Sequence, residues 1–186
     1  RPRPPTPVSP NTTRNLALGF VLGLVVGLGL AALRSALDTR IANPKDLAHL
    51  TDVPTLGAIL DDPRADKHAL VVHSNPRSPR SESFRSLRTN LQFVNVDGNP
   101  RSFVVTSSAP NEGKTTVSTN LAISLAQTGA SVVLVDADLR KPSVAKVMGV
   151  DGSIGLTSVL AGLVELEDVL TPWVGGGLHV VPAGRI

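Results

Sequence analysis

Residues 103–116 combine an apolar run with a loop of small residues that ends in one lysine and two threonines. The apolar run at 103–105 predicts a strand that leads directly into the loop. Phosphate groups bind the backbone N–H groups at the start of a helix, and the loop must be lined with small residues for them to approach. We therefore predict a phosphate-binding loop with the contact residues Ser108, Ala109, Pro110, Asn111, Glu112, Gly113, Lys114, Thr115 and Thr116.

Two side chains of this loop have the chemistry that a nucleoside triphosphate requires. Lys114 is placed to reach the β- and γ-phosphates, and the Thr115 hydroxyl is placed to ligate a Mg²⁺ ion that bridges them. The loop departs from the strict motif at Ser108, which stands where the first glycine belongs. An ordinary polar turn between a strand and a helix is the alternative. The sequence after the loop favours phosphate binding, because it predicts a helix with an apolar face and a terminal glycine: Val117, Leu121, Leu125 and Gly129.

A second apolar run, residues 131–135, is followed by two aspartates. Its β-branched composition predicts a central parallel strand that is buried on both faces. Alternation along an extended chain then places Asp136 and Asp138 on one side, at the sheet edge where ligands bind in open α/β folds. We predict that Asp136 and Asp138 act with Lys114 in catalysis, and that Thr115 and Asp136 bind the metal. An ion pair with Arg140 is the structural alternative for either carboxylate.

Residues 15–33 contain no charged side chain and are nearly all Leu, Val, Gly or Ala. As a helix they would extend about 28 Å, which is close to the hydrocarbon thickness of a bilayer. We predict a transmembrane helix, with a buried soluble helix or a signal peptide as alternatives. Gly19, Gly23 and Gly27 form a stripe along which a second helix could approach closely.

The rest of the chain divides around this helix. Residues 1–14 are proline-rich and are assigned to the extracytoplasmic side, because ATP binding places the C-terminal part in the cytoplasm. Residues 34–80 are interpreted as a mostly irregular linker with a short helix at 45–50. Residues 81–186 form the predicted nucleotide-binding domain, with a further short helix at 155–162 and a short strand at 178–181.

The periodicity of residues 81–95 predicts a helix that carries three charged residues at intervals of three: Glu82, Arg85 and Arg88. A row of one acid and two arginines is suited to ion pairs with a neighbouring subunit, and a solvated charged face is the alternative.

Composition limits the other possibilities. The net charge is +3 with no aromatic stacking set or basic run, so nucleic acid is not predicted as a partner. The chain has no cysteine, which excludes disulfides and thiolate metal sites. Its four histidines lack the spacing of metal ligands.

Together, the loop at 107–116 and the aspartate motif at 132–142 resemble the nucleotide-binding motifs of bacterial tyrosine kinases of the polysaccharide co-polymerase type. The resemblance implies an α/β, P-loop NTPase-like fold with a parallel sheet flanked by helices, preceded by one transmembrane helix. It implies ATP and Mg²⁺ as cofactors, tyrosine autophosphorylation, and control of capsular polysaccharide or exopolysaccharide polymerisation and export. It also implies an inner-membrane or plasma-membrane location, the polysaccharide polymerase and export machinery as partners, and a ring-like homo-oligomer built through Glu82, Arg85 and Arg88.

Two features of the family pattern are missing from this sequence. No apolar run that ends in aspartate follows Val150, and the chain contains no tyrosine. We therefore expect the sequence to be a fragment that binds nucleotide at most. Two alternatives remain, a non-catalytic chain-length regulator with a nucleotide-binding module and a partition-type positioning ATPase. The latter is disfavoured because Ala109 stands where such ATPases usually carry an additional lysine.

Overall fold

The computed structural model describes residues 11–37, 53–61, 69–94 and 102–185. The chain separates into two compact units, residues 1–53 and 54–186. The first contains one long helix, and the second contains the phosphate loop with every other described helix and strand. Each unit is described by itself.

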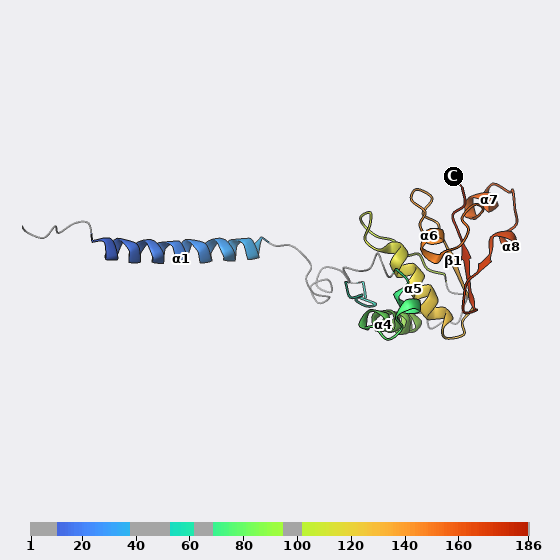
Figure 1. The fold of residues 1–186 in the computed structure, drawn as a ribbon, viewed down its shortest axis with the longest axis horizontal. Coiled ribbons are helices and arrows are strands. Elements are labelled where there is room, and N and C mark those ends of the chain that lie inside the picture. Colours follow the sequence, from blue (N-terminus) through green and yellow to red (C-terminus); the bar gives the residue numbers. More distant parts are fainter. Residues whose placement is uncertain (1–10, 38–52, 62–68, 95–101, 186) are drawn as a thin grey trace, which may run out of the picture. The chain divides into compact units, whose positions relative to one another are not determined.

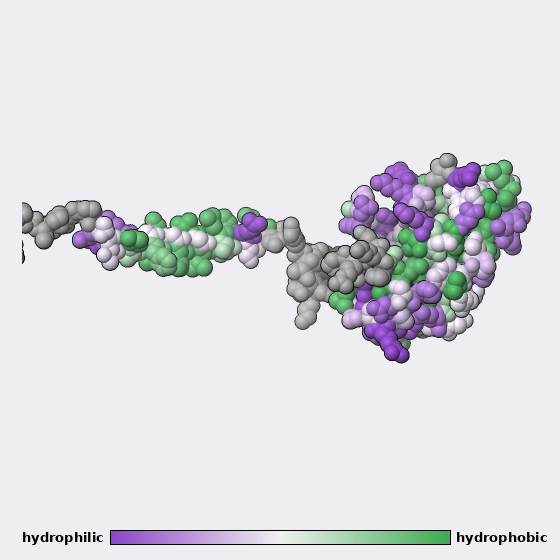
Figure 2. Space-filling view, in the orientation of Figure 1, coloured by the Kyte–Doolittle hydropathy of each residue, from purple (hydrophilic) through white to green (hydrophobic). Residues whose placement is uncertain are grey.

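Helix α1, Thr12–Ala36, includes the whole of the predicted span 15–33 and extends it by about one turn at each end. It has 25 residues and a mean hydropathy of 2.5 in its most apolar window. None of its residues is buried within the protein, and Figure 2 shows apolar side chains along its middle with hydrophilic residues at both ends. The helix is long and apolar enough to cross a membrane.

The second unit, residues 54–186, is built around helix α5, Lys114–Ala126. One side of α5 packs against α4, Pro79–Val94, and the other side packs against the sheet (Figure 1). The short helix α3, Val71–Ser74, contacts both α4 and α5. The core between these elements is apolar, and its most buried members include Val72, Phe84, Ile123 and Val180.

The sheet has three strands in the order β1-β3-β2. Strand β1, Val132–Val135, lies parallel to β3, Leu178–Val181, with Val132 opposite Leu178. Strand β2, Thr171–Pro172, runs antiparallel to β3, so the described sheet is mixed rather than purely parallel. Strand β3 coincides with the predicted strand at 178–181.

Two sequence predictions about strands were wrong. Strand β1 is not buried on both faces, because Val133 and Val135 are 52% and 44% exposed and β1 pairs, among the described strands, with β3 alone. Residues 103–105 form no strand, and Val104 is 89% exposed. Composition predicts a tendency towards extended backbone, but a strand exists only where another strand satisfies its N–H and C=O groups.

The chain between the first and last strands forms three short helices: α6, Val144–Met148, α7, Leu156–Leu160, and α8, Leu166–Val169. Helix α7 confirms the short helix predicted at 155–162. Gly155 precedes it because a Cβ atom there would lie 2.1 Å from the carbonyl oxygen of Pro182. This close approach lets the N–H groups of Leu156 and Thr157 bond the carbonyls of Pro182 and Ala183.

The predicted linker at 34–80 also requires correction. Val71 and Val72 are 4% and 0% exposed, so residues 69–80 belong to the packed unit rather than to an irregular connection. Short-range patterns missed this because the apolar stretch is only four residues long and acquires its partners from α4 and α5. The helix predicted at 45–50 lies outside the described residues.

Candidate phosphate-binding site

The phosphate loop ends where α5 begins, at Lys114. Gly113 has φ 81° and Asn111 has φ 63°, both in the left-handed region, so the chain turns sharply before the helix. The carbonyl of Gly113 accepts the N–H of Val117 at 2.8 Å, which makes it the first acceptor of the helix. The N–H groups of residues 114–116 therefore have no acceptor in a preceding turn, and a helix N-terminus of this kind favours anions.

A carboxylate of the loop binds the loop's own donors. Glu112 Oε2 accepts the backbone N–H of Ala109 at 3.0 Å and the Ser108 hydroxyl at 3.2 Å. The hydrogen bond from the Ala109 N–H is the largest cause of the lowered pKa of Glu112, and the Ser108 hydroxyl lowers that pKa further. Ionised Glu112 thus fixes the bend between residues 108 and 112.

We expect this contact to titrate. The folded loop favours the carboxylate form, so the contact is complete above the ordinary Glu pKa of 4.5 and is lost as pH falls through the lowered value in the folded protein. In an NMR titration, the Ala109 amide signal should move with a midpoint below 4.5. Glu112→Gln should abolish this movement, whereas Glu167→Gln, at an exposed position on α8, should leave it intact. A midpoint at or above the ordinary value would contradict the contact.

A chain of hydrogen bonds connects the phosphate loop to the loop after β1. The Thr115 hydroxyl lies 2.6 Å from Ser143 Oγ, and the Ser143 N–H donates to Asp136 Oδ2 at 3.0 Å. Ser143 therefore bonds both of the predicted metal-binding residues, Thr115 and Asp136. Sequence reasoning missed Ser143, although a serine directly before a short apolar helix is a recognisable N-cap signal.

Asp136 is buried, with only 4% of its surface exposed. Besides Ser143, its carboxylate accepts the N–H groups of Val144 at 3.0 Å and Asp138 at 3.2 Å. It therefore satisfies orphan donors at the start of α6. Three of the roughly four hydrogen bonds that a carboxylate can accept are therefore formed with backbone donors of the described residues.

The predicted alignment of Asp136 and Asp138 on one side was wrong. The strand ends at Val135, the chain turns, and the exposed Asp138 accepts the N–H of Lys141 at 3.1 Å instead. Among the described residues neither carboxylate forms an ion pair with Arg140. Alternation holds only while the backbone stays extended, and here the Asp136 side chain is directed by the helix that follows it.

The helix N–H groups and Lys114 have the chemistry that binds nucleotide phosphates, and the oxygens of Thr115 and Asp136 have the chemistry that binds Mg²⁺. Lys114 is partly exposed, and its ammonium group has no hydrogen-bond or ion-pair partner among the described residues. Lys114 is the first residue of α5 and directly precedes Thr115, so it belongs to the turn whose N–H groups lack an acceptor in a preceding turn. Mg²⁺, when bound, would neutralise phosphate charge, and Thr115 with Asp136 would hold it.

The charged row on α4 is divided by the fold. Glu82 and Arg85 form an exposed ion pair at 2.7 Å, and Arg85 also donates to the carbonyl of Pro76 at 2.6 Å. Arg88 instead turns inward and donates to the carbonyl of Ser124 at 3.0 Å. That carbonyl lies in the last turn of α5, where the N–H of Thr128 bonds Leu125 rather than Ser124. Arg88 therefore caps the C-terminus of the phosphate-loop helix.

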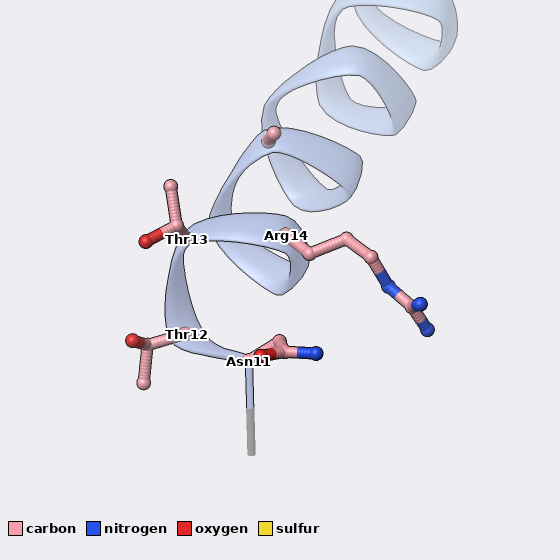
Figure 3. Close-up of a pocket in the computed structure, with 5 residues that line it drawn as sticks. Asn11, Thr12, Thr13 and Arg14 are labelled. Carbon is pink, nitrogen blue, oxygen red and sulfur yellow. The ribbon is translucent and has the colours of Figure 1, made fainter. Parts of the chain in front are cut away.

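A surface hollow at the start of α1 is unrelated to this chemistry. It is lined by Asn11, Thr12, Thr13, Arg14 and Ala17. Figure 3 shows the Thr13 and Arg14 side chains pointing away from the helix on different sides, so they do not converge on a common point. None of the predicted site residues lines it.

Comparison with known proteins finds one matching family model and several relatives of this chain. Residues 100–184 match a ParA family model, described as NUBPL iron-transfer P-loop NTPase. The tyrosine-protein kinase YwqD of Bacillus subtilis (strain 168) is 39% identical over 117 residues, which is 63% of this chain and 49% of that protein. The tyrosine-protein kinase Etk of Escherichia coli (strain K12) is 29% identical over 201 residues, 98% of this chain and 28% of that protein.

The solved kinase domain of Etk superimposes with a TM-score of 0.73 at 28% identity, covering 79% of this chain and 62% of that one. The chain is a homologue of the bacterial tyrosine kinases. This confirms the resemblance predicted from the loop and the aspartate motif, and with it the P-loop NTPase-like fold of helices around a sheet. A third relative, a Klebsiella pneumoniae protein whose name places it in the cps region, is 29% identical over 196 residues, 97% of this chain and 27% of that protein.

The chain spans about half of YwqD and about a quarter of Etk. The likeness to Etk extends beyond the family-model match at 100–184 and includes the apolar helix. The tyrosine kinases therefore account for more of this chain than the general P-loop NTPase model does.

Proposed function

We propose that this chain is the membrane-anchored, nucleotide-binding part of an ATP-dependent protein-tyrosine autokinase. The observation that carries the proposal is the bonded series Thr115, Ser143 and Asp136, which links the phosphate loop to the loop after β1 in a homologue of tyrosine kinases. A P-loop NTPase of another family would also contain a phosphate loop, but it would not be a homologue of the tyrosine kinases. The partition-ATPase alternative receives support from the ParA match alone.

We propose one role for each group of site residues. Lys114 and the N–H groups of residues 111–116 bind the phosphates, with Ser108, Ala109 and Pro110 forming the bend that precedes them. Thr115 and Asp136 hold Mg²⁺, and Asp138, which is exposed in the loop after β1, activates the hydroxyl that is phosphorylated.

The apolar helix α1 anchors the kinase in the inner or plasma membrane. Its length and hydropathy support this placement, and ATP binding requires the phosphate loop to be cytoplasmic. The relative in the cps region supports a role in capsular polysaccharide or exopolysaccharide synthesis. The polymerase and export machinery are then the partners of the membrane portion.

Calorimetric titration of the chain in detergent with Mg²⁺-ATP and Mg²⁺-ADP tests the nucleotide site. We expect heat of binding with both nucleotides. Phosphoryl transfer is tested by expressing the chain with the coding sequence that adjoins it in its genome. Labelled phosphate should move from ATP to a glutamate–tyrosine copolymer. Nucleotide binding without transfer would favour the non-catalytic chain-length regulator.

We also propose that the charged residues of α4 form an oligomer contact. The contact is restricted to the pair Glu82 and Arg85, because Arg88 turns inward. Glu82→Ala should reduce association in light scattering and change stability little, because exposed ion pairs contribute about 0–1 kcal/mol. Arg88→Ala should instead lower the free energy of unfolding by about 1–2 kcal/mol, because the Ser124 carbonyl loses its cap. If Glu82→Ala associates as the wild type does, the ion pair is not an oligomer contact and α4 is a solvated surface.

A further inference from the structure

A buried amide connects the segment before α4 to the phosphate-loop helix. Asn120 lies on α5, four residues after Thr116, and is 0% exposed. Its Oδ1 accepts the N–H of Val72 at 3.0 Å, and its Nδ2 donates to the carbonyl of Ala69 at 2.6 Å. The same Nδ2 donates to the carbonyl of Thr116 at 2.8 Å. Both amide N–H groups and one acceptor direction are therefore in use.

The Thr116 carbonyl belongs to the first turn of α5, the part of the helix that presents its N–H groups to phosphate. The peptide that joins Thr116 to Val117 is fixed from both ends, because the Val117 N–H bonds the Gly113 carbonyl. Asn120 thus contacts the phosphate loop on one side and residues 69–72 on the other.

The segment held by Asn120 is itself ordered from a second direction. Ser81 on α4 is 0% exposed, and its Oγ lies 2.7 Å from the Asn75 carbonyl and 3.1 Å from the Val71 carbonyl. Val71 and Val72 fill the core between these two polar contacts. Movement of the segment would leave several buried polar groups without partners, which makes small intermediate displacements unfavourable.

We propose that Asn120 is a positioning residue that couples residues 69–75 to the phosphate loop, so that nucleotide binding and docking of this segment stabilise each other. The coupling deepens the proposed function and rests on it. By linkage it acts in both directions: bound nucleotide tightens the segment, and release of the segment weakens nucleotide binding. The residue touches no phosphate and acts through the first turn of α5.

The test measures amide hydrogen exchange at Val72 in the chain in detergent, with and without saturating Mg²⁺-ADP. Calorimetry on the same samples gives the ADP affinity. In the wild type, ADP should slow exchange at Val72 by about 10-fold, within the usual range of coupling between sites. In Asn120→Ala the ADP effect on Val72 should fall below about 2-fold, and ADP affinity should weaken by about 5–10-fold.

Two matched variants separate coupling from loss of stability. Thr119→Val removes a buried hydroxyl that bonds only carbonyls of α5, so it disturbs the helix without touching the segment. Ser81→Ala loosens the segment without touching α5. Both should retain the ADP effect at Val72, whatever their thermal midpoints.

An ADP effect that persists in Asn120→Ala, or that is absent in a wild type that does bind ADP, would overturn the proposal. If Asn120→Ala fails to fold, exchange at Val72 in the wild type with and without ADP still tests the proposal by itself. Absence of any heat of binding in the wild type would instead remove the proposed nucleotide function, and the coupling with it.

Discussion

Lys114→Met should reduce affinity for Mg²⁺-ATP by about 100-fold or more in calorimetric titration. The ammonium group is placed to form charge-assisted contacts with phosphate oxygens, each worth about 1.5–3 kcal/mol, and about 1.4 kcal/mol corresponds to a tenfold change in affinity. Methionine keeps most of the aliphatic stem and removes the charge. The change in binding is therefore a change in electrostatics rather than in packing.

The fold should not suffer from this substitution. Lys114 is partly exposed and makes no hydrogen bond or ion pair within the part of the chain that the structure describes. The free energy of unfolding should change by no more than about 0.5 kcal/mol, which is typical of surface substitutions. Lys146→Met, at an exposed position of α6, removes the same charge outside the loop and should leave affinity unchanged. Equal affinity in Lys114→Met and the wild type would refute the phosphate-loop assignment.

Asp136→Ala should have the largest effect on stability, lowering the free energy of unfolding by about 3 kcal/mol. The substitution leaves the N–H groups of Asp138, Ser143 and Val144 without their acceptor in a buried place. For a domain of this size such a loss corresponds to a fall of roughly 10 °C in the thermal midpoint. The measurement is thermal unfolding followed by far-UV circular dichroism, which reports the loss of secondary structure.

The variants Asp136→Asn and Asp138→Ala separate the structural role of Asp136 at the start of α6 from the proposed catalytic role of the two aspartates. Asparagine keeps one oxygen acceptor, so Asp136→Asn should cost only about 1 kcal/mol while it removes the charge proposed to hold Mg²⁺. Asp138 is exposed, and among the described residues its carboxylate bonds only the Lys141 N–H, so Asp138→Ala should be nearly neutral for stability. If Asp136→Ala unfolds at the wild-type temperature, Asp136 does not organise the start of α6. If Asp136→Asn binds Mg²⁺-ADP as the wild type does, its metal role is excluded.

The buried position of Asp136 affects how its chemistry should be understood. Three backbone donors hold its carboxylate in one orientation, and Ser143 relates it to the Thr115 hydroxyl. A metal-binding carboxylate benefits from such support, because orientation set by surrounding hydrogen bonds tunes the ligand. The same bonds make it a structural residue, so loss of activity in a variant here is informative only beside a measurement of folding.

The amino-acid sequence by itself determined the features that depend on neighbours along the chain. The phosphate loop and the start of its helix follow from small residues, Gly113 and Lys114, and the strand at 178–181 follows from a short run that ends in two valines, between glycines and a proline. The apolar stretch at 15–33 needed only its length and lack of charge. The family resemblance, which the comparisons confirm, came from two such local motifs.

Only the tertiary structure decided which groups meet across distance. It left residues 103–105 unpaired, exposed one face of β1, turned Asp136 towards α6, and directed Arg88 to the end of α5. It also placed Asn120 between the phosphate loop and residues 69–72. A polar side chain takes the partner that satisfies it best, and that partner here lies on an element whose position local sequence does not specify.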